Sequence, residues 1–222
     1  MSNVICVDGP AASGKSTVSK AVAKKIAYLY VDSGALYRIV TWLALAADVD
    51  TASPEKMAEF AKVVKIDFVV RDGRVVYEVN GEELGDRIRT PEINSHVSPV
   101  SAVPEVRTLI TNWLRDLRKL GNLIVEGREI GSVVYPDSPH RFYLDADPEE
   151  RTRRRLKEDV EKGFADANSQ DKVKASLMNR DKIDSTRKTA PLMVPVGSTR
   201  IDTTAMSIDD VVALIVASSV TQ

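Results

Sequence analysis

Cysteine is nearly absent from this chain. The single copy, Cys6, lies inside a short apolar stretch at residues 4–7 and has no second cysteine with which to pair. This excludes a disulfide framework and a zinc site built on cysteines, and it suits a protein of the reducing cytoplasm. We expect Cys6 to be a core residue and not a reactive thiol.

An excess of charge of either sign is also missing. The 31 lysines and arginines are almost balanced by 32 aspartates and glutamates, which leaves a formal net charge of −1. No overall field therefore attracts the chain to nucleic acid or to an anionic membrane, and we expect neither as a partner. The positive charge must act locally, at a particular site.

Long apolar runs, internal repeats and low-complexity linkers are absent too. No run approaches the roughly 18 apolar residues of a membrane span, and the first strand-like stretch begins without a basic and apolar leader. With 222 residues, the chain can bury a substantial core. We therefore expect a cytoplasmic protein that folds as one α/β domain.

The chain does contain a complete phosphate-binding loop. Residues 9–16 match the pattern G-x-x-x-x-G-K-[ST] at every fixed position, between a strand-like run at 4–7 and a helical pattern at 17–26. The glycines let backbone N–H groups point at polyphosphate oxygens, while Lys15 adds a mobile positive charge and Ser16 offers a hydroxyl to Mg²⁺. We predict that a nucleotide, in the first place ATP, contacts Gly9, Pro10, Ala11, Ala12, Ser13, Gly14, Lys15, Ser16 and Thr17.

Short apolar strands alternate with helical segments along the rest of the chain. Strand-like runs at residues 28–31, 123–125, 142–144 and 200–202 follow the first one, and the segments between them show helical periodicity. This order predicts an α/β fold, a doubly wound parallel sheet of about five strands with helices on both faces.

A β-hairpin interrupts this alternation. Residues 66–70 and 75–79 have strand patterns and are joined through Asp72-Gly73, a frequent hairpin turn. We interpret the hairpin as part of a small α+β insertion that is separate from the parallel sheet. Several local predictions lie on either side of it. Ser33 caps a helix, and Ser53 and Thr90, each followed by a proline and a glutamate, cap two more. Residues 98–101 connect two helices.

Polar residues follow two of the predicted strands. Residues 126–129 come directly after one strand and Asp145 after another. Because the carboxyl ends of parallel strands border the ligand crevice of such a sheet, these residues are candidates for the site.

Three classes of protein share this kind of loop: switch GTPases, ATP-driven motors and small-molecule kinases. A switch needs Asp-x-x-Gly at the γ-phosphate, and no aspartate of this chain has glycine three positions later. A motor needs more partner surface than this length provides. A kinase needs a second anionic site, which scattered arginines can supply by neutralising charge. Those arginines are Arg38, Arg128, Arg180 and Arg187.

A cluster of cations follows the predicted strand at 142–144. Five of the seven residues from 151 to 157 are arginine or lysine. Such a cluster is ordinarily the solvated face of a helix, but beside a triphosphate loop it can also close over the phosphates as a lid. Both interpretations remain open from the sequence.

A more specific resemblance rests on seven segments in a fixed order. They are similar to those of bacterial cytidylate kinases over nearly the whole chain: residues 8–17, 32–38, 88–92, 98–107, 126–131, 181–192 and 201–204. The resemblance implies the P-loop nucleoside monophosphate kinase fold in one domain, residues 1–222. Its core would comprise residues 1–32, 105–148 and 186–222, its monophosphate-binding region residues 33–104 with a hairpin insertion at 64–86, and its lid residues 149–170.

The resemblance also implies roles for individual side chains. Ser98 and Arg107 match the positions that read the cytosine edge, where a hydroxyl and a guanidinium can satisfy the O2 and N3 acceptors. Glu129 stands where the family has an aspartate that receives the exocyclic amine, so it reaches one methylene further. The acceptor's phosphate would be held by Ser33, Arg38, Arg128 and Arg187, its ribose by Asp184 and Arg180, and ATP would be covered by Arg151, Arg154 and Arg155.

The activity implied by the resemblance is the ATP-dependent phosphorylation of CMP and dCMP by a monomer. Mg²⁺ would accompany ATP at Ser16, and the catalytic residues would be Lys15, Arg128, Arg180 and Arg187. Two alternatives remain open. One is a kinase of UMP, another nucleoside monophosphate or a sugar acid on the same scaffold, and the other is a nucleotide-dependent regulatory module that transfers no phosphate.

Overall fold

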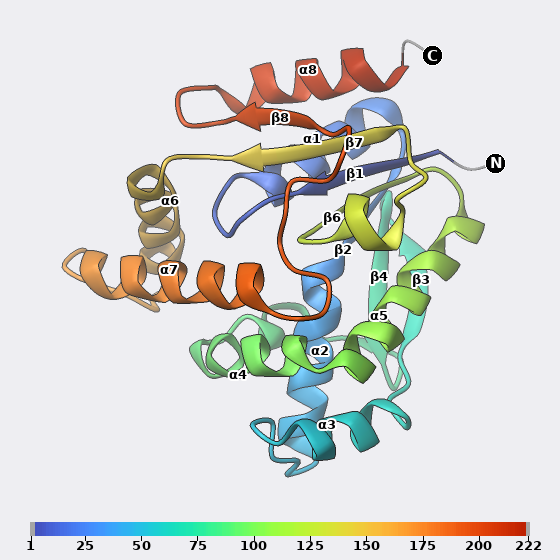
Figure 1. The fold of residues 1–222 in the computed structure, drawn as a ribbon, viewed down its shortest axis with the longest axis vertical. Helices are drawn as coiled ribbons and strands as arrows, with labels where there is room; N and C mark the ends of the chain where they lie inside the picture. Colours follow the sequence, from blue (N-terminus) through green and yellow to red (C-terminus); the bar gives the residue numbers. More distant parts are fainter. Residues whose placement is uncertain (1–2, 221–222) are drawn as a thin grey trace.

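Five parallel strands form the centre of the fold. The computed structural model describes residues 3–220, and every neighbouring pair among these five strands is parallel. This confirms the predicted doubly wound sheet. In spatial order (Figure 1) the strands are β2 (Leu29–Asp32), β6 (Leu123–Gly127), β1 (Val4–Asp8), β7 (His140–Asp145) and β8 (Thr199–Asp202).

Alternate residues of the strands face two different layers of helices. In β1, Val4 and Cys6 belong to one hydrophobic core, whereas Ile5 and Val7 belong to a second one, as the two-residue period of a strand requires. Cys6 is fully buried, as predicted. The first core includes side chains of α2 (Ser33–Ala46) and α5 (Pro104–Asp116), and the second includes side chains of α1 (Lys15–Ile26) and α8 (Ile208–Val220).

The hairpin extends this sheet, so the prediction that it is separate from the sheet was wrong. β4 (Arg74–Val79) pairs antiparallel with β3 (Asp67–Arg71) and with β5 (Glu82–Glu83). It also pairs in parallel with β2, and the Tyr30 N–H donates to the Gly73 carbonyl at 3.0 Å. Because an uncovered β2 would expose its outer hydrogen-bonding groups, the insertion protects an edge that local sequence patterns do not reveal.

The helices around the hairpin begin where capping residues predict. The Ser53 and Thr90 hydroxyls accept hydrogen bonds from backbone N–H groups at the starts of α3 (Pro54–Ala61) and α4 (Pro91–Ala102). Residues 98–101 lie inside α4, not between helices as predicted, because the buried face that begins at Ile93 continues through Val97 and Val100. A short 3-10 helix, Gly85–Ile88, precedes α4, and another, Leu117–Leu120, follows α5.

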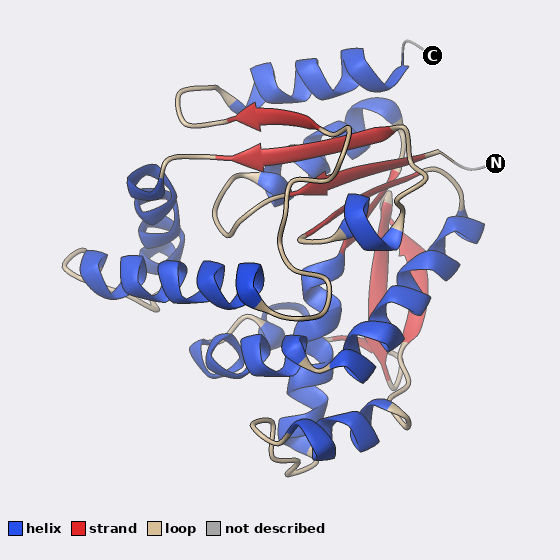
Figure 2. Ribbon diagram, in the orientation of Figure 1, coloured by secondary structure: helices blue, strands red, loops and turns tan. Residues whose placement is uncertain are grey.

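Two further helices lie beyond the carboxyl ends of the strands. α6 (Pro148–Glu161) follows β7 and packs against α7 (Gln170–Thr186), and both stand apart from the sheet at the left of Figure 1. Figure 2 shows a long loop between α7 and β8 and a short helical turn after β6, a π-helix at Ile130–Val134. Within residues 3–220, no helix has the length and apolar character that crossing a membrane requires.

Candidate active site

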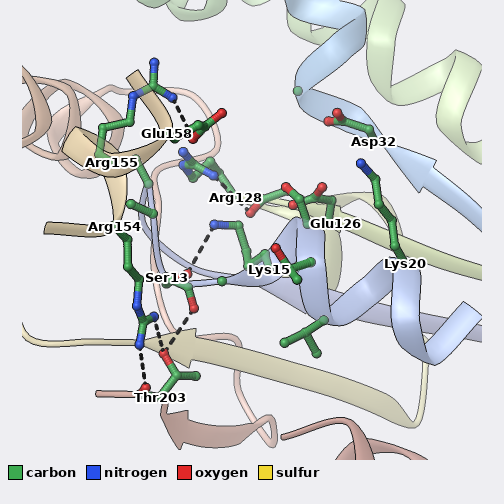
Figure 3. Close-up of a pocket in the computed structure, with 18 of the residues that line it drawn as sticks. Ser13, Lys15, Lys20, Asp32, Glu126, Arg128, Arg154, Arg155, Glu158 and Thr203 are labelled. Atoms are coloured by element: carbon green, nitrogen blue, oxygen red, sulfur yellow. Dashed lines mark hydrogen bonds and ion pairs between the residues drawn. The ribbon is translucent and has the colours of Figure 1, made fainter. Parts of the chain in front are cut away.

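A cavity of about 1380 Å³ opens at the carboxyl ends of β1, β2 and β6. Its lining comes from the loop after β1, the start of α2, the segment after β6 and helices α4, α6 and α7. This is the crevice that an open parallel sheet offers to ligands. Figure 3 shows a part of the lining, in which the loop and α6 face each other.

The phosphate-binding loop depends on two glycines. Gly9 has a φ of +147°, and a Cβ atom there would lie 2.0 Å from the Leu144 carbonyl oxygen of β7. Gly14 has a φ of +90° and immediately precedes α1. The loop therefore packs directly on the sheet and ends at the positive pole of a helix, a geometry that favours bound anions.

Lys15 folds back over its own loop. Its Nζ atom donates to the Pro10 carbonyl at 2.5 Å and to Ser13 Oγ at 3.3 Å (Figure 3). Burial and the positive charge of Arg128 lower the pKa of Lys15. The ammonium group can exchange these two neutral acceptors for phosphate oxygens, whose charge makes stronger hydrogen bonds.

Two carboxylates line the cavity close to Lys15. Glu126 of β6 accepts a hydrogen bond from the Tyr30 hydroxyl at 2.5 Å, and Asp32 at the end of β2 accepts one from Arg89 at 2.7 Å. Burial and the negative charge of Asp32 raise the pKa of Glu126. The strand-end pattern identified Glu126 as a candidate, but it assigned no role to Asp32.

Asp32 also takes the capping role that was predicted for Ser33. Its Oδ1 accepts a hydrogen bond from the Ala35 N–H at 3.1 Å at the start of α2. Ser33 instead donates its hydroxyl to the Glu126 carbonyl at 2.6 Å, which joins α2 to β6. The prediction of the cap was wrong by one residue, because both side chains are good caps and only the backbone geometry distinguishes them.

A third carboxylate, Asp8, is completely buried at the end of β1. Its two oxygens accept hydrogen bonds from the N–H groups of Ile130 and Gly131, each at 2.7 Å. Burial raises the pKa of Asp8 to about 7. Asp8 therefore anchors the segment after β6 to the strand that precedes the phosphate-binding loop, a role that the sequence analysis missed although Asp8 begins one of its seven segments.

At another part of the cavity lining, Asp184 of α7 gathers three arginines. Its oxygens lie 3.0 Å from Arg128 Nε, 3.2 Å from Arg187 Nη1 and 4.0 Å from Arg180 Nε. Asp184 is buried, yet these positive charges lower its pKa. One carboxylate thus holds three cations beside one another at the cavity wall.

Arg38 of α2 also lines the cavity. Its Nη1 donates to Asn94 Oδ1 at 2.6 Å and to the Ile88 carbonyl at 3.3 Å. Burial and the like charges of Arg180 and Arg89 lower the pKa of Arg38 to about 9. Buried cations that disfavour one another in this way mark a place where an anion is strongly attracted.

The arginines around Asp184 and Arg38 form a second site for anions, and a buried ion pair between Arg107 and Glu129 lies next to it. Arg107 Nη2 of α5 lies 2.5 Å from Glu129 Oε1, and each side chain is only 3% exposed. Arg107 also donates to the Ser101 carbonyl at 2.8 Å. Glu129, Ser98 and Ser101 line the cavity, whereas Arg107 lies behind them.

The arginines of α6 differ in what they contact. Arg154 donates to the Thr203 hydroxyl at 3.0 Å and to the Thr203 carbonyl at 2.7 Å, while Thr203 itself donates to the Ser13 carbonyl (Figure 3). Arg155 pairs with Glu158 and Asp159 at the cavity wall. Arg153, which the sequence analysis did not choose, also lines the cavity.

Arg151, which was predicted to contact ATP, does not line the cavity. Its Nη1 lies 2.5 Å from Asp181 of α7 and donates to the Ala11 carbonyl of the loop at 3.2 Å. It therefore joins α6, α7 and the loop from behind. Gly9, Pro10, Arg107 and the strand-end candidate Asp145 are the other predicted site residues outside the lining.

A triphosphate loop and an arginine cluster that share one cavity, with a helical pair beside its opening, define the chain as a P-loop kinase of small molecules. Sequence comparison gives the family. The sequence model of the family described as "Cytidylate kinase" matches residues 5–221, so the chain belongs to the cytidylate kinase family and is a phosphotransferase. The resemblance seen in the seven segments is thereby confirmed.

Curated relatives agree with this assignment. The chain is 40% identical over 211 residues to a cytidylate kinase of Lactiplantibacillus plantarum, a match that covers 95% of this chain and 92% of the relative. It is also 40% identical over 213 residues to a cytidylate kinase of Bacillus cereus, with 96% and 94% covered. Among solved structures, an uncharacterized protein from Eubacterium ventriosum has a TM-score of 0.54 at 12% identity over 99% of both chains, which supports the fold alone.

Proposed function

We propose that this chain transfers the γ-phosphoryl group of ATP to CMP and dCMP, with ADP and CDP or dCDP as products. The observation that carries the proposal is a single cavity with two sites for anions. One is the loop with Lys15, and the other is the arginine group around Asp184. Beyond the second site, Glu129 and Ser98 line the cavity and offer an acceptor and a hydroxyl that suit the edge of cytosine, and Arg107 holds Glu129 from behind the lining.

The donor half binds ATP with its triphosphate along residues 9–17, where Lys15 bridges the β and γ phosphates. Ser16, Asp32 and Glu126 would hold the Mg²⁺ that accompanies ATP, because Mg²⁺ prefers oxygen ligands and keeps several of its waters, and the ion would neutralise phosphate charge there. All three line the cavity. Arg154 and Arg155 cover the donor from α6.

The acceptor half binds the monophosphate with Ser33, Arg38, Arg128 and Arg187. Asp184 and Arg180 bind the ribose, and Ser98 and Glu129 read the base, while Arg107, which lies behind the cavity lining, holds Glu129 through their ion pair. In this arrangement the two nucleotides lie with their phosphates toward each other, between Lys15 and Arg128. Every group that holds a phosphate is a cation or a neutral hydrogen-bond donor. The contacts that bind the phosphates therefore also orient them for transfer.

Transfer itself asks little covalent chemistry of the protein. An oxygen of the acceptor phosphate attacks the γ-phosphorus, and because that phosphate is already anionic near neutral pH, no strong general base is required. Lys15, Arg128, Arg180 and Arg187 neutralise the charge that gathers between donor and acceptor. Closure of α6 and α7 over the substrates excludes water.

The division into core, monophosphate-binding region and lid, the monomeric state and the cytoplasmic location stay predictions. The division into regions follows from the proposed binding mode, in which residues 33–104 contribute to the acceptor site and residues 149–170 cover the donor. Size-exclusion chromatography with light scattering measures the oligomeric state directly.

A panel of acceptors tests the proposed function. ADP formation from ATP is measured with CMP, dCMP, UMP and AMP at subsaturating concentrations, and the products are resolved by chromatography. We expect the cytidine pair to be preferred by up to on the order of 10⁴-fold, because a buried site rejects an analogue that leaves its polar groups unpaired. A preference for UMP or AMP contradicts this acceptor, and ADP release without a phosphorylated product contradicts a transferase.

A further inference from the structure

Glu129 is held by three donors from three different elements. The Tyr37 hydroxyl donates to Oε1 at 2.9 Å, Arg107 Nη2 lies 2.5 Å from the same oxygen, and Arg187 Nη2 lies 3.1 Å from Oε2. A carboxylate accepts about four hydrogen bonds. One position therefore remains for a ligand in the cavity, and its direction is set by the donors already in place.

Tyr37 contacts both members of the buried ion pair. Besides its hydrogen bond to Glu129, its aromatic ring lies under the Arg107 guanidinium, with Cζ 5.3 Å from the ring centroid. This distance is in the range of a cation–π contact. Tyr37 also lines the cavity, yet the proposed function assigns it no role.

The Tyr37 hydroxyl remains a hydrogen-bond donor at every physiological pH. Burial and the negative charge of Glu129 raise the pKa of Tyr37 well above its ordinary value. Because the Tyr37 hydroxyl always donates to Oε1, the free hydrogen-bonding position of Glu129 that faces the cavity is left as an acceptor. Cytosine presents an amine to such a group, whereas uracil presents a carbonyl, which an acceptor repels.

We propose that Tyr37 is a positioning residue that sets the preference for cytosine over uracil acceptors, by fixing Glu129 through its hydroxyl and Arg107 through its ring. The inference rests on the proposed function. Its physical basis is the length of the Glu129 side chain, whose carboxylate is separated from the backbone by three torsions. Because each free torsion lowers the fraction of time in which a hydrogen bond is aligned, the glutamate needs an additional constraint.

The substitution Tyr37→Phe tests this role, because it keeps the ring under Arg107 and removes a single oxygen. We expect kcat/KM for CMP to fall about tenfold, as for loss of a hydrogen bond to a charged group. The change should appear in KM, with kcat at saturating CMP kept within about twofold, since Glu129 contacts the base and not the reacting phosphates. The kcat/KM for UMP should change less than about twofold, so the CMP to UMP ratio falls about tenfold.

Tyr135→Phe is the matched control. Tyr135 is also buried, donates its hydroxyl to the Leu114 carbonyl and lies under a guanidinium, that of Arg118, at 5.1 Å. It does not line the cavity. We expect this variant to lose stability but to keep the CMP to UMP ratio. Thermal melts of both variants fix an assay temperature at which each is folded.

The outcomes separate this inference from the proposed function. If the wild-type chain shows no preference for CMP, the proposed function fails and the inference fails with it. If the wild type prefers CMP and Tyr37→Phe keeps the same ratio, or lowers CMP and UMP turnover equally, then only the inference is overturned. Calorimetric affinities of CMP and UMP for the same proteins give this ratio without turnover, and the CMP to UMP affinity ratio should also fall about tenfold in Tyr37→Phe.

Discussion

The two halves of the cavity are built in different ways. The donor half is made from consecutive residues 9–17, and its shape depends on the backbone of Gly9 and Gly14. The acceptor half is made from side chains of α2, α5, α7 and the segment after β6, joined by buried ion pairs such as Arg107 with Glu129. A site made of backbone is local and separable from the fold, whereas a site made of ion pairs is part of what holds the fold together.

The largest effect expected from this comparison is on stability in the acceptor half. Arg107→Ala leaves the Glu129 carboxylate buried without its nearest cation, and breaking a buried pair in this way costs about 3–5 kcal/mol. We expect the low end, about 3 kcal/mol, because Glu129 keeps Tyr37 and Arg187. Urea unfolding measures the loss.

The control for Arg107 is an arginine whose ion pair is exposed. Arg74 pairs with Glu83 at 2.7 Å on the hairpin, with side chains 41% and 33% exposed. Arg74→Ala should lower the free energy of unfolding by less than about 1 kcal/mol. Equal losses in the two variants would mean that the acceptor half carries no special share of the stability.

The second effect in size concerns catalysis. Arg187→Ala removes a guanidinium that lies beside Asp184 and Glu129 and is proposed to grip the acceptor's phosphate. One lost charge-assisted hydrogen bond is equivalent to about 1.5–3 kcal/mol, or about 10- to 150-fold in kcat/KM for CMP. The KM for ATP should stay nearly constant. Arg200→Ala, which removes an exposed pair with Asp145 outside the cavity, serves as the control.

A third and smaller effect is a dependence of ATP affinity on pH, specific to the donor half. Burial and Arg128 lower the pKa of Lys15 in the free protein, and a bound triphosphate raises it again. Binding therefore takes up a proton once Lys15 is partly deprotonated. Above about pH 7, where phosphates are fully ionised, affinity should fall as pH rises, by at most about tenfold per unit.

Calorimetry in two buffers with different ionisation enthalpies measures this proton uptake. In Lys15→Met the uptake should disappear, even though Asp8, whose pKa is raised to about 7, still titrates in the same range. Uptake that persists in Lys15→Met assigns the proton to another group. Near pH 7, CMP binding should show no such uptake, because the acceptor half binds with arginines and even Arg38, whose pKa is lowered to about 9, is protonated there.

The sequence predicted local structure well and long-range contacts poorly, a division that matches the one between the donor and acceptor halves. The loop, the five strands and the caps at Ser53 and Thr90 were predicted, since each depends on residues near one another in the chain. The pairing of the hairpin with β2 and the anchoring of residues 130 and 131 by Asp8 were not predicted. These contacts join residues that are more than 40 positions apart, and local periodicity contains no record of them.

Side-chain direction was the second limit of the sequence. Arg151 and Arg154 lie three residues apart on the same helix, and both were assigned to the ATP lid. The structure aims Arg154 at Thr203 in the cavity and buries Arg151 against Asp181 behind it. The two arginines differ only because α7 lies beside Arg151, which the sequence does not reveal. Tyr37 was assigned no role because its partner Glu129 lies 92 residues further along the chain.

The smallest expected effect is a change in the free energy of unfolding when Lys15 of the donor half is replaced, and it tests most directly whether that half is separable from the fold. Lys15 is a buried cation, and its removal from water on folding costs free energy. Replacing it in Lys15→Met should therefore abolish turnover while changing the free energy of unfolding by less than about 1 kcal/mol at pH 6, because removal of the desolvation cost offsets the lost hydrogen bonds and the Pro10 carbonyl keeps the Ser13 hydroxyl as a donor at 3.1 Å. The remaining change comes from Glu126, whose pKa is already raised by burial and rises further without the neighbouring ammonium. A carboxyl whose pKa is higher in the folded than in the unfolded state stabilises the fold only while it is protonated, so the variant should be less stable at pH 8 than at pH 6. Urea unfolding of both proteins at the two pH values checks this, and a loss at pH 6 as large as that of Arg107→Ala would show that the donor half is no more separable from the fold than the acceptor half.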